Sequence, residues 1–302
     1  MISLFKGRKA EEALLKYTIE QLVKKEVPEC FHFNATRNLI IVRVADQNGF
    51  LIFGSRQSYE TFKDTTSDKS YIAGNIGNGV PLMEIAVDNV ARFRDPSDLK
   101  SLIFGVYVYE VRSIYEPPPY DEYTVIQNNG GKKLFKIPFC EVSCEKNGFD
   151  KDYKFHFVYS NAMDDMRMGR EFMTENYFTN ISGYVLKWEA FEKPPAANKQ
   201  HLSLQLMENI EKMKVTDANR LTVAHYTEEL RGKLNRIINH EADLYVGEKY
   251  YSNNYDINDI PLQTKIIAAE ALVIHYIQHL KREIKKKDAN CNCHHTTNLW
   301  DI

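Results

Sequence analysis

The sequence predicts an α+β protein in which a mainly antiparallel β-sheet region with a few helices is followed by an all-helical region. Apolar residues recur at every second position in several segments before residue 192, a rhythm typical of strands. Beyond residue 200 they recur three and four positions apart, as in amphipathic helices. A segment with two prolines, residues 193–200, separates the two patterns, so we expect a boundary there.

The composition is that of a folded chain. Apolar residues make up 43% of the 302 residues and aromatic residues 12%, enough for an ordinary core. Lys and Arg number 39 against 41 Asp and Glu, so the formal charge of −2 gives no overall field to attract nucleic acid or anionic lipid. Charged residues follow Met1 closely, and no apolar run approaches the roughly 18 residues of a membrane span. We therefore expect a protein without a transmembrane segment that is cytoplasmic or located in a virion, and not secreted.

The first region, residues 1–192, should open with an amphipathic helix over residues 11–25 that ends near Pro28. Asn48 and Gly49 suit a turn with positive φ, so the runs on either side of them predict a hairpin. The elements expected in this region are strands at residues 39–44, 50–53, 101–115, 122–126, 133–139, 153–159 and 184–191, and a docking helix at residues 161–178.

The second region, residues 201–287, is predicted to be a three-helix domain. Its helices are expected at residues 202–213, 216–246 and 260–287. Asp217 and Asp259 lie near two of the helix starts, where a carboxylate interacts favourably with the helix dipole. Residues 193–200 form the expected linker, and residues 288–302 form a polar tail that contains Cys and His.

Four consecutive residues after the long strand at residues 101–115 fit a Pro-Pro-x-Tyr pattern: they are Pro117, Pro118, Pro119 and Tyr120. WW domains bind such polyproline II segments in aromatic-lined grooves. The four residues resemble the late-domain motifs of viral matrix proteins, and this resemblance implies a WW-domain protein as a partner. Prolines that only stiffen a turn between two strands would look the same, so a structural interpretation stays open.

The tail and the helix before it contain six residues with donor atoms that zinc accepts: Cys291, Cys293, His294, His295, His275 and His279. The last two are one helical turn apart, as two ligands need, but the four donors of the tail crowd a tetrahedral site. We expect no cofactor, with zinc at these residues as the alternative. The basic run at residues 281–287 beside two cysteines would equally suit a palmitoylated membrane patch. A charged helix end followed by a chemically inert tail is the third interpretation.

No catalytic pattern stands out in the sequence. The segment at residues 74–79 is rich in glycine but lacks the Lys and Ser or Thr of a P-loop, and the dipeptide His240-Glu241 lacks the second His of a zinc protease. We therefore expect a non-enzymatic structural or adaptor protein of a larger assembly, such as a virus or phage structural protein. It would act through contacts with other subunits, as a homo-oligomer or in a multi-protein assembly. The alternatives are a nucleic-acid-associated protein that uses a Tyr-rich sheet face and a basic patch, and an enzyme of unrecognised class.

Overall fold

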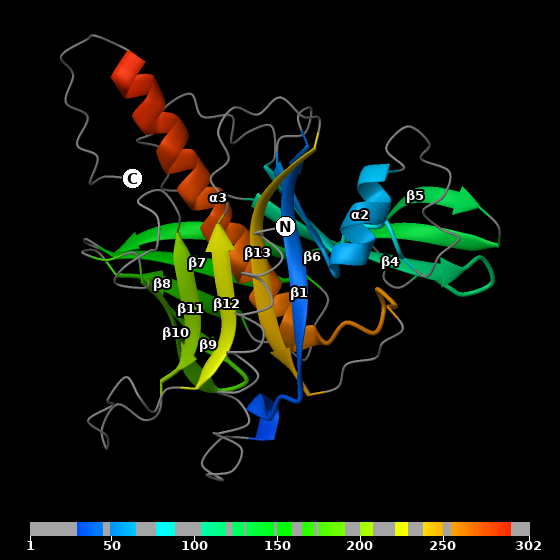
Figure 1. The fold of residues 1–302 in the computed structure, drawn as a ribbon, viewed down its shortest axis with the longest axis horizontal. Coiled ribbons are helices and arrows are strands. Elements are labelled where there is room, and N and C mark those ends of the chain that lie inside the picture. The colour runs from blue at the N-terminus through cyan, green and yellow to red at the C-terminus, as the bar shows by residue number, and fades with distance from the viewer. Residues whose placement is uncertain are drawn as a thin grey trace, which may run out of the picture.

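A computed structural model describes residues 29–44, 49–64, 77–87, 104–118, 123–129, 131–147, 150–158, 165–171, 174, 176–190, 200–207, 221–228, 238–249 and 255–290. These residues form a 13-stranded antiparallel sheet that closes on itself around a long helix, as Figure 1 shows.

The strands are β1 (Ala35–Val44), β2 (Gly49–Phe53), β3 (Met83–Val87), β4 (Phe104–Ser113), β5 (Thr124–Asn129), β6 (Lys132–Asn147), β7 (Asp150–Phe157), β8 (Met166–Arg170), β9 (Tyr177–Ile181), β10 (Tyr184–Ala190), β11 (His201–Leu206), β12 (Thr222–Glu228) and β13 (Ile238–Glu248). The helices are the 3-10 helix η1 (Glu29–Phe31), α2 (Arg56–Asp64) and α3 (Leu262–Asn290).

Two meanders build the barrel. The strands from β1 to β4 pair in chain order, and so do the strands from β6 to β13. The meanders join at two seams, where Leu39 of β1 faces Leu244 of β13 and Val106 of β4 faces Cys140 of β6. Twelve strands therefore form a closed ring, and β5 lies outside it because it pairs only with β6.

Strand β6 is 16 residues long and continues beyond the ring. Its first part pairs with β5 and its last part with β7, while β4 lies along its other edge. We call β5 and the adjoining ends of β4 and β6 the arm; it projects to one side of the barrel in Figure 1. The arm carries four large exposed apolar side chains, namely Tyr115, Tyr123, Val125 and Ile126.

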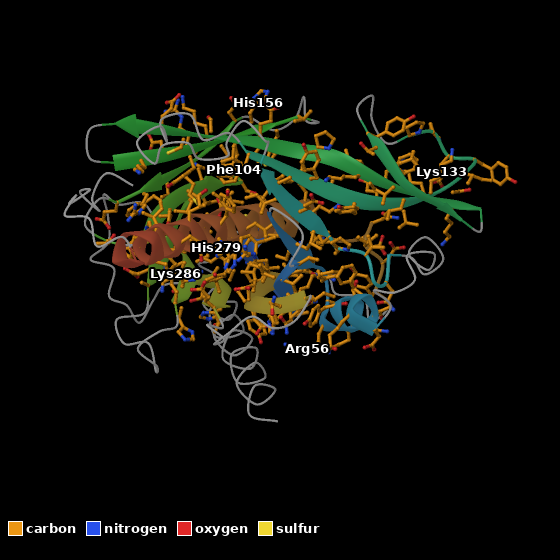
Figure 2. The ribbon with its side chains drawn as sticks, turned by 90° about the horizontal axis from the view of Figure 1, so that it is seen from above. Arg56, Phe104, Lys133, His156, His279 and Lys286 are labelled. Atoms are coloured by element: carbon orange, nitrogen blue, oxygen red, sulfur yellow. The ribbon has the colours of Figure 1, made fainter. Side chains whose placement is uncertain are left out.

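Helix α3 fills the barrel. All side chains of residues 266–278 are buried, the polar Glu270, His275 and Gln278 included, so this part of the helix is enclosed on every side. The inward side chains of the strands pack around it, and each fully buried Leu, Ile or Val stabilises the fold by about 1.5–3 kcal/mol. Figure 2 shows α3 between a layer that contains β6 and a layer that contains β13.

Helix α2 packs on the outside of the barrel. Tyr59 and Phe62 contact Phe53 and belong to a second apolar cluster that includes Ile40 and Val42 of β1. Arg56 also forms an ion pair of 3.1 Å with Asp243 of β13. Strands β1 and β13 are therefore covered on both faces, by α3 inside and by α2 outside.

The all-helical C-terminal region predicted from the sequence is wrong, and so is the α+β class built on it. Residues 201–206, 222–228 and 238–248 form β11, β12 and β13, and only α3 in this region is a helix among the described residues. The double covering of β13 explains the error, because buried side chains on both faces, His240 and Asp243 included, remove the alternation that marks a strand.

The helix predicted over residues 161–178 is also wrong, because β8 and the start of β9 lie there. In contrast, the hairpin of the strands expected at residues 39–44 and 50–53 is present as β1 and β2, although Gly49 belongs to β2 and does not have the positive φ expected of a turn residue. The last expected helix is α3. Strands β10 and β11, on either side of the expected linker, pair directly with one another, with Trp188 opposite Leu204. Two predicted segments lie outside the described residues: the helix expected at residues 11–25, and residues 193–199 of the expected linker.

Candidate functional site

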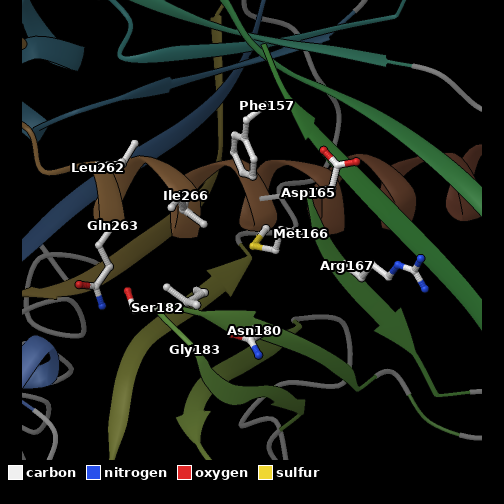
Figure 3. Close-up of a pocket in the computed structure, with 11 residues that line it drawn as sticks. Phe157, Asp165, Met166, Arg167, Asn180, Ser182, Gly183, Leu262, Gln263 and Ile266 are labelled. Atoms are coloured by element: carbon white, nitrogen blue, oxygen red, sulfur yellow. The ribbon is translucent and has the colours of Figure 1, made fainter. Parts of the chain in front are cut away.

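A pocket of about 820 Å³ lies at one end of the barrel, where α3 begins (Figure 3). Strands β7, β8 and β9, the turn from β9 to β10 and the first turns of α3 surround it. Its lining residues are Phe157, Asp165, Met166, Arg167, Asn180, Ile181, Ser182, Gly183, Leu262, Gln263 and Ile266.

A tight hairpin shapes one wall of the pocket. The two residues that join β9 to β10 are Ser182 and Gly183, with φ angles of 55° and 82°. Positive φ at both central residues defines a type I′ turn, whose twist matches that of the strands it connects. Glycine adopts this conformation without steric cost, whereas Ser182 is held in it by the hairpin.

The pocket has an apolar floor. Phe157, Met166, Ile181 and Ile266 are buried and come from three strands and the helix, while Leu262 is 49% exposed at the rim. On β8 and β9, side chains alternate between the inside and the outside of the barrel. The buried Met166 is therefore followed by the exposed Arg167, and the buried Ile181 is preceded by the exposed Asn180. An apolar floor next to a polar rim is thus a direct result of the strand geometry.

The polar rim consists mainly of hydrogen-bond donors. The Asp165 carboxylate already has a partner, because one of its oxygens lies 2.7 Å from His156 Nδ1. Within the part of the chain that the structure describes, the side chains of Arg167, Asn180 and Ser182 form no hydrogen bond or ion pair, and the buried Nε2 of Gln263 has no partner either. Figure 3 shows Gln263 and Arg167 at opposite ends of the group.

A buried carboxyl group lies one step below the floor. Glu270 follows Ile266 by four residues on α3, a rise of about 6 Å, and it accepts a hydrogen bond from Thr179, two residues before Ile181 on β9. Trp188 Nε1 donates a second hydrogen bond of 2.9 Å. Burial raises the pKa of Glu270 to about 7, although the two donors oppose this shift by stabilising the charged form.

The Pro-Pro-x-Tyr residues are partly placed by the structure. Pro117 and Pro118 are exposed and follow β4 on the arm, next to Tyr115, which is 90% exposed. Pro119 and Tyr120 lie outside the described residues. The WW-domain hypothesis therefore remains a prediction.

The structure describes two of the six zinc candidates, His275 and His279. Cys291, Cys293, His294 and His295 lie outside the described residues, so zinc binding by the tail stays a prediction. Among the described residues, no group of three or more His, Cys, Asp or Glu side chains is arranged to hold a metal ion.

His275 and His279 contact the aromatic core. His275 Nδ1 lies 2.7 Å from the Tyr226 hydroxyl, and the rings of His275 and His279 pack edge-on against Phe50, with centroid distances of 4.4 and 5.2 Å. Burial lowers the pKa of His275 well below its usual value and that of His279 to about 4. Burial thus favours neutral side chains at both positions.

Sequence reasoning missed the pocket because it assigned residues 161–178 to a helix. Two signals were available: Met166 and Met168 alternate with polar residues, and Ser182-Gly183 separates two runs rich in β-formers. No sequence pattern, however, places the start of α3 beside β8, because more than 90 residues separate them.

No helix in the described part of the chain is both long and apolar enough to cross a membrane.

Comparison with known proteins links the chain to yeast proteins. It is 28% identical over 306 residues to the protein DIA1 of Saccharomyces cerevisiae, covering 93% of this chain and 89% of that protein. It is 23% identical over 290 residues to an uncharacterized protein of the same yeast, covering 89% of this chain and 95% of that protein. No solved structure matches the chain significantly.

These relatives overturn the viral hypothesis. Both are proteins of a eukaryote, so the expectation of a virus or phage structural protein is wrong, and a virion location has no support. The Pro-Pro-x-Tyr motif does not identify the source of a protein, because four residues match such a pattern too readily by chance.

The family model described as DIA1 matches residues 34–283, well over half of the sequence. The chain therefore belongs to the DIA1 family.

Proposed function

We propose that this protein binds a small amphiphilic molecule in the pocket at the start of α3. The observation that carries this proposal is the combination of an 820 Å³ cavity, an apolar floor and a rim of side-chain donors without partners among the described residues. Ligand pockets typically have volumes of about 300–1,000 Å³ and pair apolar walls with a few polar groups that orient the ligand. The mouth of a barrel is a common place for them.

The closed barrel supports the same proposal. A ring of twelve strands packed on an internal helix holds the pocket walls rigidly, since β8, β9 and α3 are each anchored in the common core. A preformed site loses little conformational entropy when a ligand binds.

An uncharged hydrophobic fluorophore, N-phenylnaphthylamine, tests this function. Its emission should rise on binding to the protein, and Leu262→Asp should abolish most of this rise because it places a charge at the apolar rim. The variant should fold, since a carboxylate in the first turn of a helix is favourable. Leu262→Met should retain binding, and Val185→Asp, at an apolar position that is 37% exposed but lies outside the pocket, should do so as well.

The proposal fails if the original protein does not raise the emission of the fluorophore. It also fails if Leu262→Asp binds as well as the original protein while its circular dichroism spectrum and unfolding midpoint are unchanged.

A second candidate function is the binding of a WW domain through the arm. The exposure of Pro117 and Pro118 favours it, because a polyproline II ligand must present its prolines to an aromatic groove. The exposed Tyr115 and Val125 on the same arm offer further apolar surface. A cytoplasmic location, expected from the sequence, would give access to such partners and belongs to this proposal.

A further inference from the structure

We infer that the ligand of the pocket carries an anionic group, a carboxylate or a phosphate, and that Arg167 binds it. This inference rests on the proposed function, because it names the chemical class of the ligand for the same pocket. It comes from an inventory of the charges and hydrogen-bonding groups on the rim.

The rim contains two charged side chains, and only one of them is paired. The Asp165 carboxylate lies 2.7 Å from His156 Nδ1. The Arg167 guanidinium is exposed and forms no ion pair or hydrogen bond within the described residues. The rim therefore lacks an anionic partner for Arg167, whereas Asp165 already has a partner.

The neighbouring polar groups have the same preference. Asn180 and Gln263 each present an amide NH₂ group, and Ser182 presents a hydroxyl, and each of these can donate to an acceptor. The buried Gln263 Nε2 also has no partner among the described residues, but it lies at the opposite end of the group from Arg167, so it would serve a second acceptor on the ligand. Carboxylate and phosphate oxygens accept several such bonds at once, and Arg binds both in a bidentate manner.

The strand register places the anion at the rim. Met168 of β8 lies opposite Thr179 of β9, so Arg167 and Asn180 are neighbours one position further along, on the outward face. An anion bound there stays partly hydrated, which keeps its desolvation cost small. The apolar part of the ligand would then lie on Met166 and Ile181.

The buried Glu270 favours the same orientation. Its carboxyl group lies about one helical turn below the floor residue Ile266 and has a pKa near 7, so it is partly ionised at neutral pH. An anionic group that entered the floor would be repelled by this carboxylate. The anionic end of the ligand therefore faces outward, toward Arg167.

Displacement of the bound fluorophore by four compounds with the same alkyl chain tests the inference: dodecanoate, dodecyl phosphate and dodecyltrimethylammonium, each below its micellar concentration, and dodecanol below its solubility limit. At least one of the two anions should displace the dye at about a tenfold lower concentration than dodecanol, because hydrogen bonds between charged groups are stronger than those between neutral groups. The two anions together distinguish carboxylate from phosphate recognition. The cation should be the weakest competitor.

Variants at position 167 assign the effect to one side chain. Arg167→Gln should remove the advantage of the anions over dodecanol, and Arg167→Lys should keep part of this advantage because it keeps the charge. Lys133→Gln is the matched control, because it removes one positive charge from the arm, away from the pocket (Figure 2).

Two results would overturn the inference, and they differ from failure of the proposed function. If dodecanol and the anions displace the dye equally in the original protein, or if Arg167→Gln leaves the advantage of the anions intact, the pocket binds amphiphiles without recognising an anion. If neither the dye nor any alkyl compound binds, the proposed function fails together with this inference.

Discussion

Trp188 Nε1 donates a hydrogen bond of 2.9 Å to the carboxyl group of Glu270 inside the barrel. Both side chains are fully buried, and Thr179 donates to the other carboxyl oxygen. An ionisable group in an apolar interior is costly unless it is neutral or well paired. The two donors reduce this cost without removing it, so the pKa of Glu270 is raised to about 7.

The substitution Glu270→Gln should change how stability depends on pH. The folded-state pKa of about 7 exceeds the ordinary 4.5, so the folded protein binds more protons between these pH values. The contribution of Glu270 is therefore complete below about pH 4.5 and is lost as pH rises through 7. Gln does not ionise, so the variant does not lose this contribution. The free energy of unfolding of Glu270→Gln, relative to that of the original protein, should therefore increase by on the order of 3 kcal/mol from acid to mildly alkaline pH.

Urea unfolding at about pH 5 and pH 8 measures this difference. Glu283→Gln is a control on the same helix, because Glu283 pairs with Lys286 near the surface and its pKa is lowered. If the free energies of unfolding of Glu270→Gln and the original protein depend on pH in the same way, the raised pKa of Glu270 is contradicted.

The buried histidines should make the fold sensitive to acid. Burial lowers the pKa of His279 to about 4 and that of His275 well below its usual range. The unfolded chain then binds more protons below the ordinary pKa of 6.5, so stability should fall as pH drops from 6.5 toward 4. Replacing His279 by Gln should reduce this fall.

Thermal unfolding across this pH range tests the role of His279. His156→Gln provides the comparison, because it removes a histidine that is exposed and not buried, so it should not reduce the fall in stability. An equally steep loss of stability in His279→Gln and the original protein would rule out His279 as one of the responsible groups.

The fit of α3 inside the barrel should depend on its small residues. Ala271 is fully buried, so a larger side chain has no space there. We expect Ala271→Phe to destabilise the protein by about 1–3 kcal/mol or more through overpacking. Lys285→Phe, at an exposed position of the same helix, should change stability by less than about 0.5 kcal/mol. Equal unfolding midpoints in urea for the two variants would mean that α3 is not enclosed.

The Pro-Pro-x-Tyr segment should bind WW domains if its residues are accessible. Tyr120→Ala should abolish capture of the protein by immobilised WW domains, because the tyrosine is part of the recognised pattern. Tyr115→Ala removes a 90% exposed tyrosine that lies outside the motif, and it should leave capture intact. Failure of the original protein to be captured would reject this candidate function.

Local patterns identified many of the strands but not their partners. The hairpin of β1 and β2 was predictable because its two strands follow one another within about 15 residues, although Gly49, expected in the turn, belongs to β2. The segment of β11 also has the pattern of a strand, since Leu202, Leu204 and Leu206 alternate with polar residues, although a longer window predicts a helix there. That error came from counting apolar residues over too long a window.

The rest required contacts between distant segments. The apolar residues of β13 resemble a helical pattern because α2 buries the outer face of the strand, and nothing within β13 indicates this. The pocket has the same origin, because Arg167, Ser182 and Leu262 come from three separate elements. Neither case can be resolved from a window of one sequence.

The amino-acid sequence by itself determined that the chain folds, where several of its strands lie and that a helix occupies most of residues 260–287, because hydrophobic period is a local property. Only the tertiary structure decided that this helix lies inside a closed ring of strands and that a pocket forms where it enters. Ring closure depends on pairing β1 with β13 and β4 with β6, and burial on both faces of a strand erases the alternation from which such pairing would be inferred.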